Sequence, residues 1–197
     1  MIKNHTDLLN YLAKKYNLIS YLEIGVQNPA NNYDKIKCLN KSGCDPEPAS
    51  LSIGIFRVCS DDYFKLFPKD IRSELIFIDG LHHEDQVKRD FDNSLKCLMP
   101  GGFIVIHDTL PENEPGTHVP RETKMWWGDV YKFAMKLGRY EGINFVTFDI
   151  DNGCTVVWKG EGVQQAYDGG YSWEDFQKHK DQLLRINSIK DIDVLLP

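Results

Sequence analysis

Apolar residues along the chain follow either a helical or a strand-like pattern. Leu8, Leu12 and Tyr16 repeat near helical intervals, whereas Leu75–Ile78 and Phe103–Ile106 are short continuous apolar runs typical of strands buried on both faces. The helical pattern predicts helices over residues 6–16, 33–40, 60–67, 83–97 and 130–137. The strand pattern predicts strands over residues 19–26, 42–44, 53–59, 74–78, 103–106, 143–150 and 154–159.

Strands that alternate with helices are typical of an α/β fold with a mostly parallel sheet. Asn152-Gly153 between the last two strands indicates a hairpin, which we expect to add an antiparallel edge to that sheet. In the tail, Ser172 is a candidate N-cap for one more helix. We therefore expect one domain over residues 1–160 and a helical extension over 161–197, packed on this domain or on a partner subunit.

Composition and charge narrow the class of function. Hydrophobic residues are 42% and charged residues 26% of the 197 positions, as in ordinary globular proteins. The formal charge of −6 gives no basic surface for nucleic acid or an anionic membrane. No apolar run could span a bilayer, and residues 1–10 lack the apolar segment of a signal peptide. The five cysteines have no metal-type spacing, so we expect reduced thiols and a cytoplasmic protein.

Polar residues that could carry chemistry follow two consecutive predicted strands. Asp79 and His82 come after one strand, and His107 and Asp108 come after the next. Because ligands bind outside the carboxyl ends of such strands, we expect these four side chains to meet in a crevice. Carboxylates there suit Mg²⁺ and imidazoles suit a softer metal, while the alternative is a hydrogen-bonded polar group without metal. Asp79 or His82 is expected to act in proton transfer, whereas His83 caps a helix or faces solvent.

The end of the first strand indicates a nucleoside rather than a dinucleotide ligand. Gly25 permits a tight turn and close approach of a ligand, but Gln27 follows where the dinucleotide fingerprint needs glycine. A bound pyrophosphate is therefore not expected. Asp45 lies about 20 residues further on, where an acid would accept hydrogen bonds from ribose hydroxyls, unless Asp45-Pro46 is only a turn.

Taken together, these segments resemble the class I S-adenosylmethionine-dependent methyltransferases. They are most similar to the subgroup that includes macrocin-type sugar O-methyltransferases. The resemblance covers about residues 18–160 and rests on Leu22-Glu23-Ile24-Gly25-Val26, Asp45-Pro46, Ile78-Asp79-Gly80-Leu81-His82-His83 with Asp90, and Pro100-Gly101-Gly102 through His107-Asp108. The chain departs from the family in its first loop, which keeps one glycine, and over residues 45–53, which are short and proline-rich for the usual helix.

The resemblance implies a Rossmann-like three-layer sandwich with a mostly parallel, seven-stranded sheet whose last strand is antiparallel. It implies S-adenosyl-L-methionine as cofactor, with binding residues Glu23, Gly25, Val26, Asp45, Ser60, Asp61, Asp79 and Gly80. It also implies catalytic roles for Asp79, His82 and His107, with His82 as the candidate general base. Asp79, His107 and Asp108 are the implied ligands of a divalent cation such as Mg²⁺.

Our leading hypothesis is an O-methyltransferase for a small hydroxylated acceptor, such as a sugar or a glycosylated metabolite, with metal assistance. A nicotinamide-dependent oxidoreductase and a non-catalytic nucleoside-binding module are the alternatives. The loop over residues 110–127 is expected to set acceptor specificity, and Trp126-Trp127 near its end either lines the pocket or packs a helix on the sheet. A small molecule is the expected partner, without nucleic acid or membrane, and a homo-oligomer stays open.

Overall fold

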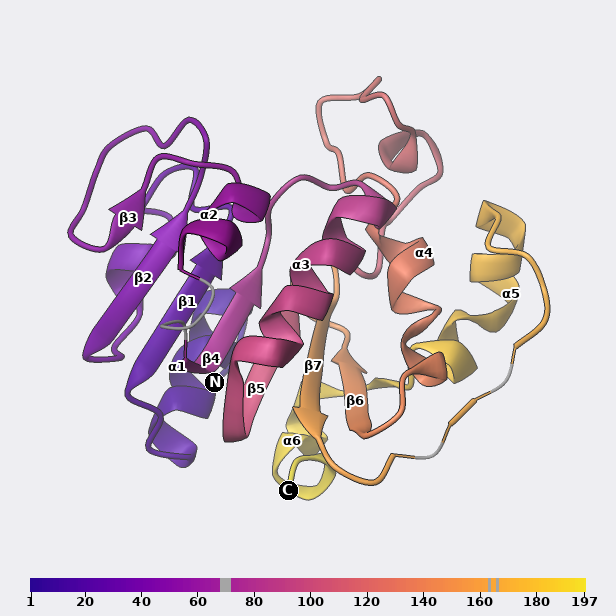
Figure 1. Cartoon of the computed structure of the whole chain (residues 1–197). Helices are drawn as coiled ribbons and strands as arrows, with labels where there is room; N and C mark the ends of the chain where they lie inside the picture. Colours follow the sequence, from indigo (N-terminus) through magenta and orange to yellow (C-terminus); the bar gives the residue numbers. More distant parts are fainter. Residues whose placement is uncertain (68–71, 163, 166) are drawn as a thin grey trace.

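Eight strands form one mixed sheet in the computed structural model, which describes residues 1–67, 72–162, 164, 165 and 167–197. Their order across the sheet is β3-β2-β1-β4-β5-β7-β6-β8 (Figure 1). The strands are β1 (Ser20–Ile24), β2 (Asn40–Cys44), β3 (Ile55–Phe56), β4 (Ser73–Ile78), β5 (Leu98–Ile106), β6 (Ile143–Phe148), β7 (Cys154–Lys159) and β8 (Ile186–Asn187).

The sheet is parallel except at β7, which is antiparallel to both β5 and β6. The expected Rossmann-like α/β class is therefore confirmed, with two corrections. The β6–β7 hairpin does not form an antiparallel edge, because β7 inserts between β5 and β6. The described sheet also has eight strands rather than seven, because the tail adds β8 beside β6 in parallel.

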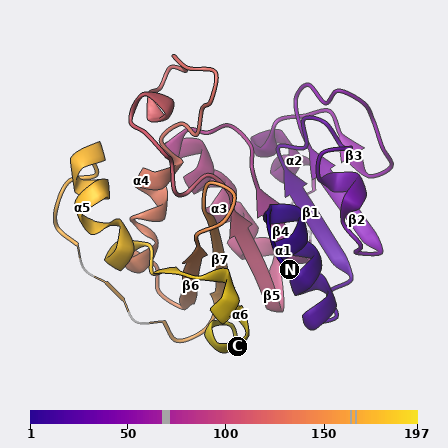
Figure 2. The same cartoon turned by 180° about the vertical axis from the view of Figure 1, so that it is seen from behind.

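Helices cover both faces of this sheet (Figure 2). The α-helices are α1 (His5–Lys15), α2 (Ser60–Leu66), α3 (Glu84–Cys97), α4 (Val130–Ala134), α5 (Trp173–Leu183) and α6 (Ile192–Leu195). Single 3-10 turns are η1 (Tyr33–Lys35), η2 (Pro115–Thr117), η3 (Leu137–Arg139) and η4 (Ile189–Asp191). None of the helices in the described part of the chain is both long and apolar enough to cross a membrane.

One of the local helix predictions was wrong. Residues 33–40 form only the turn η1, because the backbone becomes extended at Ile36 on its way to β2. The helix predicted over residues 60–67 is present as α2, which begins at Ser60 with Cys59 as its N-cap residue. The hydroxyl of Ser60 accepts a hydrogen bond from Nε2 of Gln86 at 3.1 Å.

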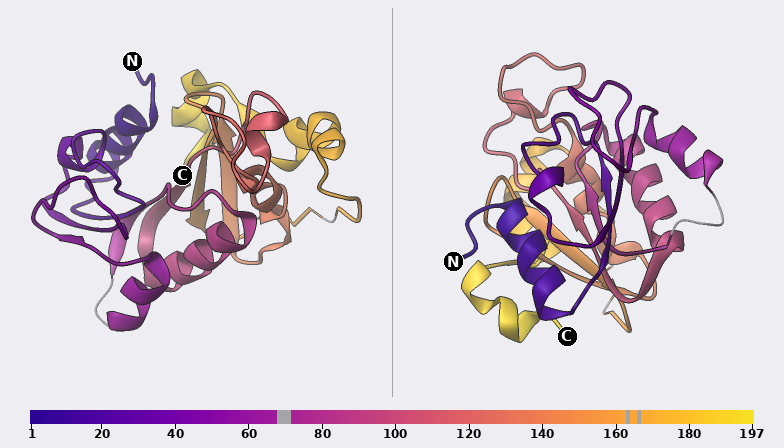
Figure 3. Two further views of the ribbon diagram at one scale, coloured as in Figure 1. Left: turned by 90° about the horizontal axis from the view of Figure 1, so that it is seen from above. Right: turned by 90° about the vertical axis from the view of Figure 1, so that its left-hand side faces the viewer.

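Successive side chains of the central strands point to opposite faces of the sheet, which divides the core into two layers. Phe77 of β4 packs on the face that α1 covers, in the same cluster as Leu12. The neighbouring Ile76 packs on the opposite face with Phe91 of α3 and Phe133 of α4. Figure 3 shows α1 and α6 on one side of the sheet and α2 and α3 on the other. Burial of both faces explains why these strands are continuous apolar runs in the sequence.

The C-terminal segment packs on the same sheet and helices. Ser172 caps α5 as expected, since its hydroxyl accepts the N–H of Asp175 and the Asp175 carboxylate accepts the N–H of Ser172. Phe176 is fully buried, with its ring 4.8 Å from that of Tyr131 on α4. At the end of the chain, Asp193 forms a 2.9 Å ion pair with Lys15 of α1. The tail therefore contributes to the core of the domain.

A carboxyl group is buried near the end of β1. Glu23 is 2% exposed and accepts hydrogen bonds from the hydroxyl of Tyr21 at 2.6 Å and the amide of Asn32 at 3.0 Å. Burial outweighs these hydrogen bonds and raises the pKa of Glu23 to about 8. The folded protein therefore keeps a proton on Glu23 at neutral pH, whereas the unfolded chain does not.

We expect Glu23→Gln to remove a pH dependence of stability. Because the pKa of Glu23 is raised from 4.5 to about 8 on folding, the wild type loses stability as the pH rises between these two values. One pKa unit corresponds to about 1.4 kcal/mol, so the loss is on the order of a few kcal/mol. Urea unfolding at pH 5.5, 7.0 and 8.5 measures it. The exposed Glu161→Gln is the control, and equal pH slopes in wild type and Glu23→Gln would contradict the prediction.

We expect Phe176→Ala to lower the free energy of unfolding by about 3–5 kcal/mol, because it leaves a cavity between α4 and α5. Urea unfolding measures this loss. Phe56→Ala is the matched control, because Phe56 is 37% exposed on β3. A change below that of the control would show that α5 does not stabilise the domain.

Candidate active site

The candidate site lies at the carboxyl ends of β4 and β5. Ile78 pairs with Ile106 in parallel register, so the next residues, Asp79 and His107, leave the sheet at the same level. The N–H of His107 still donates to the carbonyl of Ile78 at 3.1 Å. These strand ends bring together the four side chains singled out in the sequence, Asp79, His82, His107 and Asp108.

Asp79 lies between two imidazoles. Its Oδ1 is 3.2 Å from Nδ1 of His107 and 3.4 Å from Nε2 of His82. Asp108 lies beside the same rings, with Oδ2 3.3 Å from Nδ1 of His82 and Oδ1 3.4 Å from Nδ1 of His107. Asp108 has a φ of +58°, an uncommon left-handed conformation for a residue other than glycine. One ligand atom each from Asp79, His82 and Asp108 lies within 4.8 Å of the others, which is close enough to hold a metal ion.

Burial and paired charges set the protonation of this cluster. Burial opposes the charged form of both histidines, but the facing carboxylates raise the pKa of His82 and raise that of His107 well above its usual value. Burial also opposes a charge on Asp79, yet the two imidazoles hold the pKa of Asp79 below its usual value. Burial raises the pKa of Asp108 to about 6. Asp79 is therefore the carboxylate that the cluster keeps ionised.

The loop expected to set specificity is anchored on His82. The carbonyl of His82 accepts the N–H of Asp129 at 3.2 Å, and a Cβ on Gly128 would lie 1.8 Å from that carbonyl oxygen. Nδ1 of His82 lies 3.2 Å from the carbonyl of Trp126, and the two rings stack 5.3 Å apart. Because a carbonyl can only accept, Nδ1 carries the hydrogen. Nε2 of His82, which faces Asp79 at 3.4 Å, is then the nitrogen at which a proton can be exchanged.

The two ends of the same loop are tied together. The N–H groups of Trp127 and Gly128 donate to the carbonyl of Gly116 at 2.9 and 3.2 Å. A Cβ on Gly116 would lie 2.2 Å from the Trp127 ring, which is 2% exposed. Trp126 and Trp127 both line the cavity described next, and Trp127 also packs into the base of the loop. Of the two functions considered for the aromatic pair, lining of the cavity is therefore present, and the packing of Trp127 is against the loop base.

A cavity of about 750 Å³ opens in front of the cluster, between the strand ends and residues 121–127. Of the residues expected to bind a cofactor, those that line it are Glu23, Gly25, Val26, Asp45, Ser60, Asp79 and Gly80. Asp61 does not line it, because its carboxylate faces Arg89 at 3.4 Å. His83 is also outside the lining, with its ring edge-on to Trp126 at 6.0 Å.

Gly25 and Asp45 shape the cavity wall through contacts within the protein. Gly25 has a φ of +89°, and a Cβ there would lie 2.1 Å from the carbonyl oxygen of Asp79. Glycine therefore allows the segments after β1 and β4 to touch. Asp45 accepts the N–H of Gln27 at 2.9 Å and that of Glu47 at 2.8 Å, which fixes the loop after β2.

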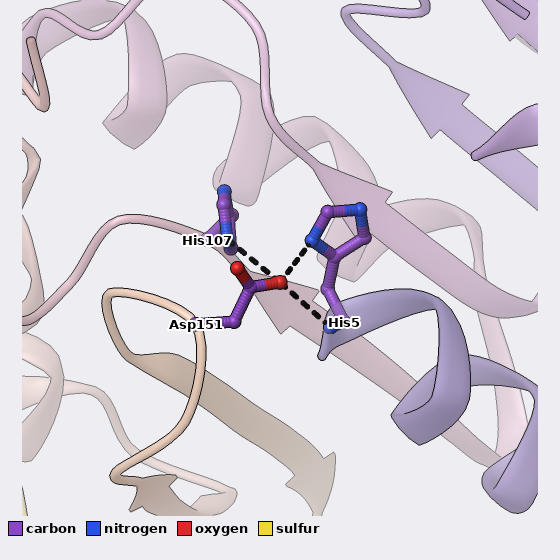
Figure 4. Close-up of side chains that lie close together, drawn as sticks. All are labelled: His5, His107 and Asp151. Atoms are coloured by element: carbon purple, nitrogen blue, oxygen red, sulfur yellow. Dashed lines mark hydrogen bonds and ion pairs between the residues drawn. The ribbon is translucent and has the colours of Figure 1, made fainter. Parts of the chain in front are cut away.

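Sequence reasoning missed two residues beside this site. His5, at the start of α1, and Asp151, in the β6–β7 hairpin, lie next to His107 (Figure 4). The local patterns around them indicated only a helix and a turn. The available signal was the strand order, because the pairing of β7 with β5 places the hairpin turn at the end of β5.

A comparison with known protein families matches the part of the chain that carries the candidate site. A family model described as a methyltransferase domain matches residues 42–109. The matched segment runs from within β2 to just beyond β5, and it carries the cluster residues Asp79, His82, His107 and Asp108.

Solved methyltransferase structures share the fold at low sequence identity. An O-methyltransferase from Bacillus cereus, in complex with SAH, has a TM-score of 0.61 at 12% identity over 79% of this chain and 80% of its own. The SAH-bound PaMTH1 methyltransferase from Podospora anserina has a TM-score of 0.57 at 15% identity over 79% and 78%. MycE, from the mycinamycin biosynthetic pathway, has 0.50 at 16% identity over 78% of this chain and 54% of MycE. The resemblance inferred from the sequence is thus confirmed: residues 42–109 match the methyltransferase-domain model, and the chain has the Rossmann-like fold of solved methyltransferases.

Proposed function

We propose that this protein is an S-adenosylmethionine-dependent O-methyltransferase for a small hydroxylated acceptor. The observation that carries the proposal is the cavity of about 750 Å³ faced by Asp79, His82 and Asp108. Cavities of this size hold cofactors and small substrates. The match to a methyltransferase domain supports the reaction, and the SAH-bound proteins from Bacillus cereus and Podospora anserina support the cofactor.

The cofactor is proposed to bind at the ends of β1, β2 and β4. Glu23, Asp45 and Asp79 line this part of the cavity, and the ionised Asp79 supplies negative charge for a cationic sulfonium. Gly25 and Gly80 also line this part of the cavity, where their backbone would face the ligand. S-adenosylmethionine supplies a methyl group activated by the positive sulfur. Because methyl transfer is an in-line displacement, the main task of these residues is to align the reactants.

The same cluster fits a divalent cation such as Mg²⁺. Asp79 and Asp108 present carboxylate oxygens within 4.8 Å of each other, and Mg²⁺ prefers oxygen ligands. Such an ion would lower the pKa of an acceptor hydroxyl. In this proposal His107 donates its Nδ1 hydrogen to Asp79 at 3.2 Å and orients it, rather than binding Mg²⁺ itself. MycE is in complex with Mg, SAH and mycinamycin VI, which supports the use of Mg²⁺ in a protein of this fold.

His82 is the proposed general base. Its Nε2 takes the proton of the acceptor hydroxyl while the oxygen forms a bond to the methyl carbon and the carbon–sulfur bond breaks. Asp79, 3.4 Å from Nε2, stabilises the resulting imidazolium. The stacked ring and the carbonyl of Trp126 hold the imidazole in this orientation.

We propose that the acceptor is a sugar or a glycosylated metabolite that binds under the loop of residues 110–127. Trp126 offers a flat apolar wall at this end of the cavity, and Arg121 and Lys124 lie beside it. The complex of MycE with mycinamycin VI supports a small-molecule acceptor. A nicotinamide-dependent oxidoreductase is less favoured, because the loop after β1 has Gln27 where a pyrophosphate would need glycine. The cytoplasmic location stays a prediction.

We expect His82→Gln to reduce methyl transfer by about 10²- to 10⁴-fold, because it removes the general base, and to leave SAH binding within a few-fold of wild type. Product formation from a panel of glycosides and other small alcohols measures the rate, and calorimetry measures SAH affinity. His179→Gln on α5 is the control. Full activity of His82→Gln would overturn the role of His82.

SAH is expected to raise the thermal unfolding temperature. A ligand at 100 times its dissociation constant adds about 2.7 kcal/mol, which is roughly 5–10 °C for a chain of this size. Adding Mg²⁺ with SAH should raise it further, and Asp108→Asn should abolish only the Mg²⁺ increment. NADH is the comparison ligand. A rise with NADH and none with saturating SAH would favour the oxidoreductase.

A further inference from the structure

A second cluster of side chains of the types that bind metals lies beside His107. Figure 4 shows His5, His107 and Asp151 converging from α1, the end of β5 and the β6–β7 hairpin. Nδ1 of His5 is 2.6 Å from Oδ2 of Asp151, and Nε2 of His107 is 3.7 Å from the same oxygen. One ligand atom from each residue lies within 4.8 Å of the others.

The cluster is incomplete as a hydrogen-bonded group. His107 is 9% exposed, and among the described residues its Nε2 has no hydrogen-bond partner. The Asp151 oxygen at 3.7 Å is beyond hydrogen-bond distance. A buried nitrogen without a hydrogen bond is costly, and this one faces the Asp151 oxygen only as an ion pair at 3.7 Å, beside His5 (Figure 4).

We propose that His5, His107 and Asp151 bind a divalent transition-metal ion of the Zn²⁺ type. Two imidazoles and one carboxylate suit such borderline cations, whereas the paired carboxylates of Asp79 and Asp108 suit Mg²⁺. The bound ion replaces the hydrogen bond between His5 and Asp151 with two metal–ligand bonds, and any proton on the ligating nitrogens is released.

The surroundings of the two imidazoles match those of metal ligands. Metal-binding histidines commonly donate their other ring hydrogen to a carboxylate, and Nδ1 of His107 lies 3.2 Å from Asp79. The ring of His5 stacks on Phe77 at 5.1 Å, which limits its rotation. His5 and His107 also line the cavity, so an ion can enter from that side. The ion would join three elements that are distant in the sequence. Its binding does not depend on the proposed methyl transfer.

The test is Zn²⁺ titration of the full chain against a chromophoric chelator. The informative variants are His5→Gln and Asp151→Asn in this cluster, and His82→Gln in the other. His118→Gln is the matched control, because His118 forms a similar 2.7 Å pair with Glu122 on the surface without a second imidazole. Circular dichroism checks that each variant is folded.

We expect one equivalent of Zn²⁺ whose affinity falls by more than about 100-fold in His5→Gln and Asp151→Asn, since even second-shell changes cost 10- to 100-fold. His82→Gln and His118→Gln should bind Zn²⁺ as the wild type does. X-ray absorption of the zinc-loaded wild type should show two imidazole ligands, and this measurement stands even if a variant fails to fold. No Zn²⁺ binding, unchanged binding in His5→Gln, or a single imidazole ligand would each overturn the proposal.

Discussion

The shared carboxylate of Asp79 is the contact on which the arrangement of the site depends. It accepts from His107 at 3.2 Å and faces His82 at 3.4 Å, so one side chain positions both imidazoles. Its own position follows from two constraints. The register of β4 with β5 sets its height, and Gly25 allows the segment after β1 to press against its backbone. Each imidazole then connects to a different part of the protein, His82 to the loop of residues 110–127 and His107 to the β6–β7 hairpin.

Much of this arrangement could be predicted from the sequence, because its signals are local. Apolar runs that end in Asp79-Gly80 and His107-Asp108 mark two strand ends, and consecutive strands in an α/β fold are commonly neighbours. The prediction that these side chains meet needed only this rule. The turn before Cys154 could also be predicted, because Asn-Gly is typical of a hairpin turn. The structure has the positive φ at Asn152 and Gly153 that such a turn requires.

What could not be predicted depends on contacts between distant parts of the chain. Nothing near His5 indicates that it meets a residue 146 positions later. The insertion of β7 between β5 and β6 and the addition of β8 follow from sheet pairing, which local patterns do not encode. Gly25 was correctly singled out as special, but the structure adds a reason in its contact with Asp79, beside the expected approach of a ligand. A local signal can therefore identify an important residue while its physical cause lies elsewhere in the fold.

The closed base of the loop of residues 110–127 has a consequence for how proteins with this fold could acquire new substrates. Gly116, Trp127 and Gly128 hold the two ends of the loop together, and Gly128 is fitted against the His82 carbonyl. The indole N–H of Trp126 donates to the carbonyl of His118 at 2.8 Å, so His118 belongs to the same junction. Residues 119–125 are then the part of the loop that evolution or an engineer could exchange for another sequence. A new sequence there would change which molecules enter, while the histidine beneath it would keep its place.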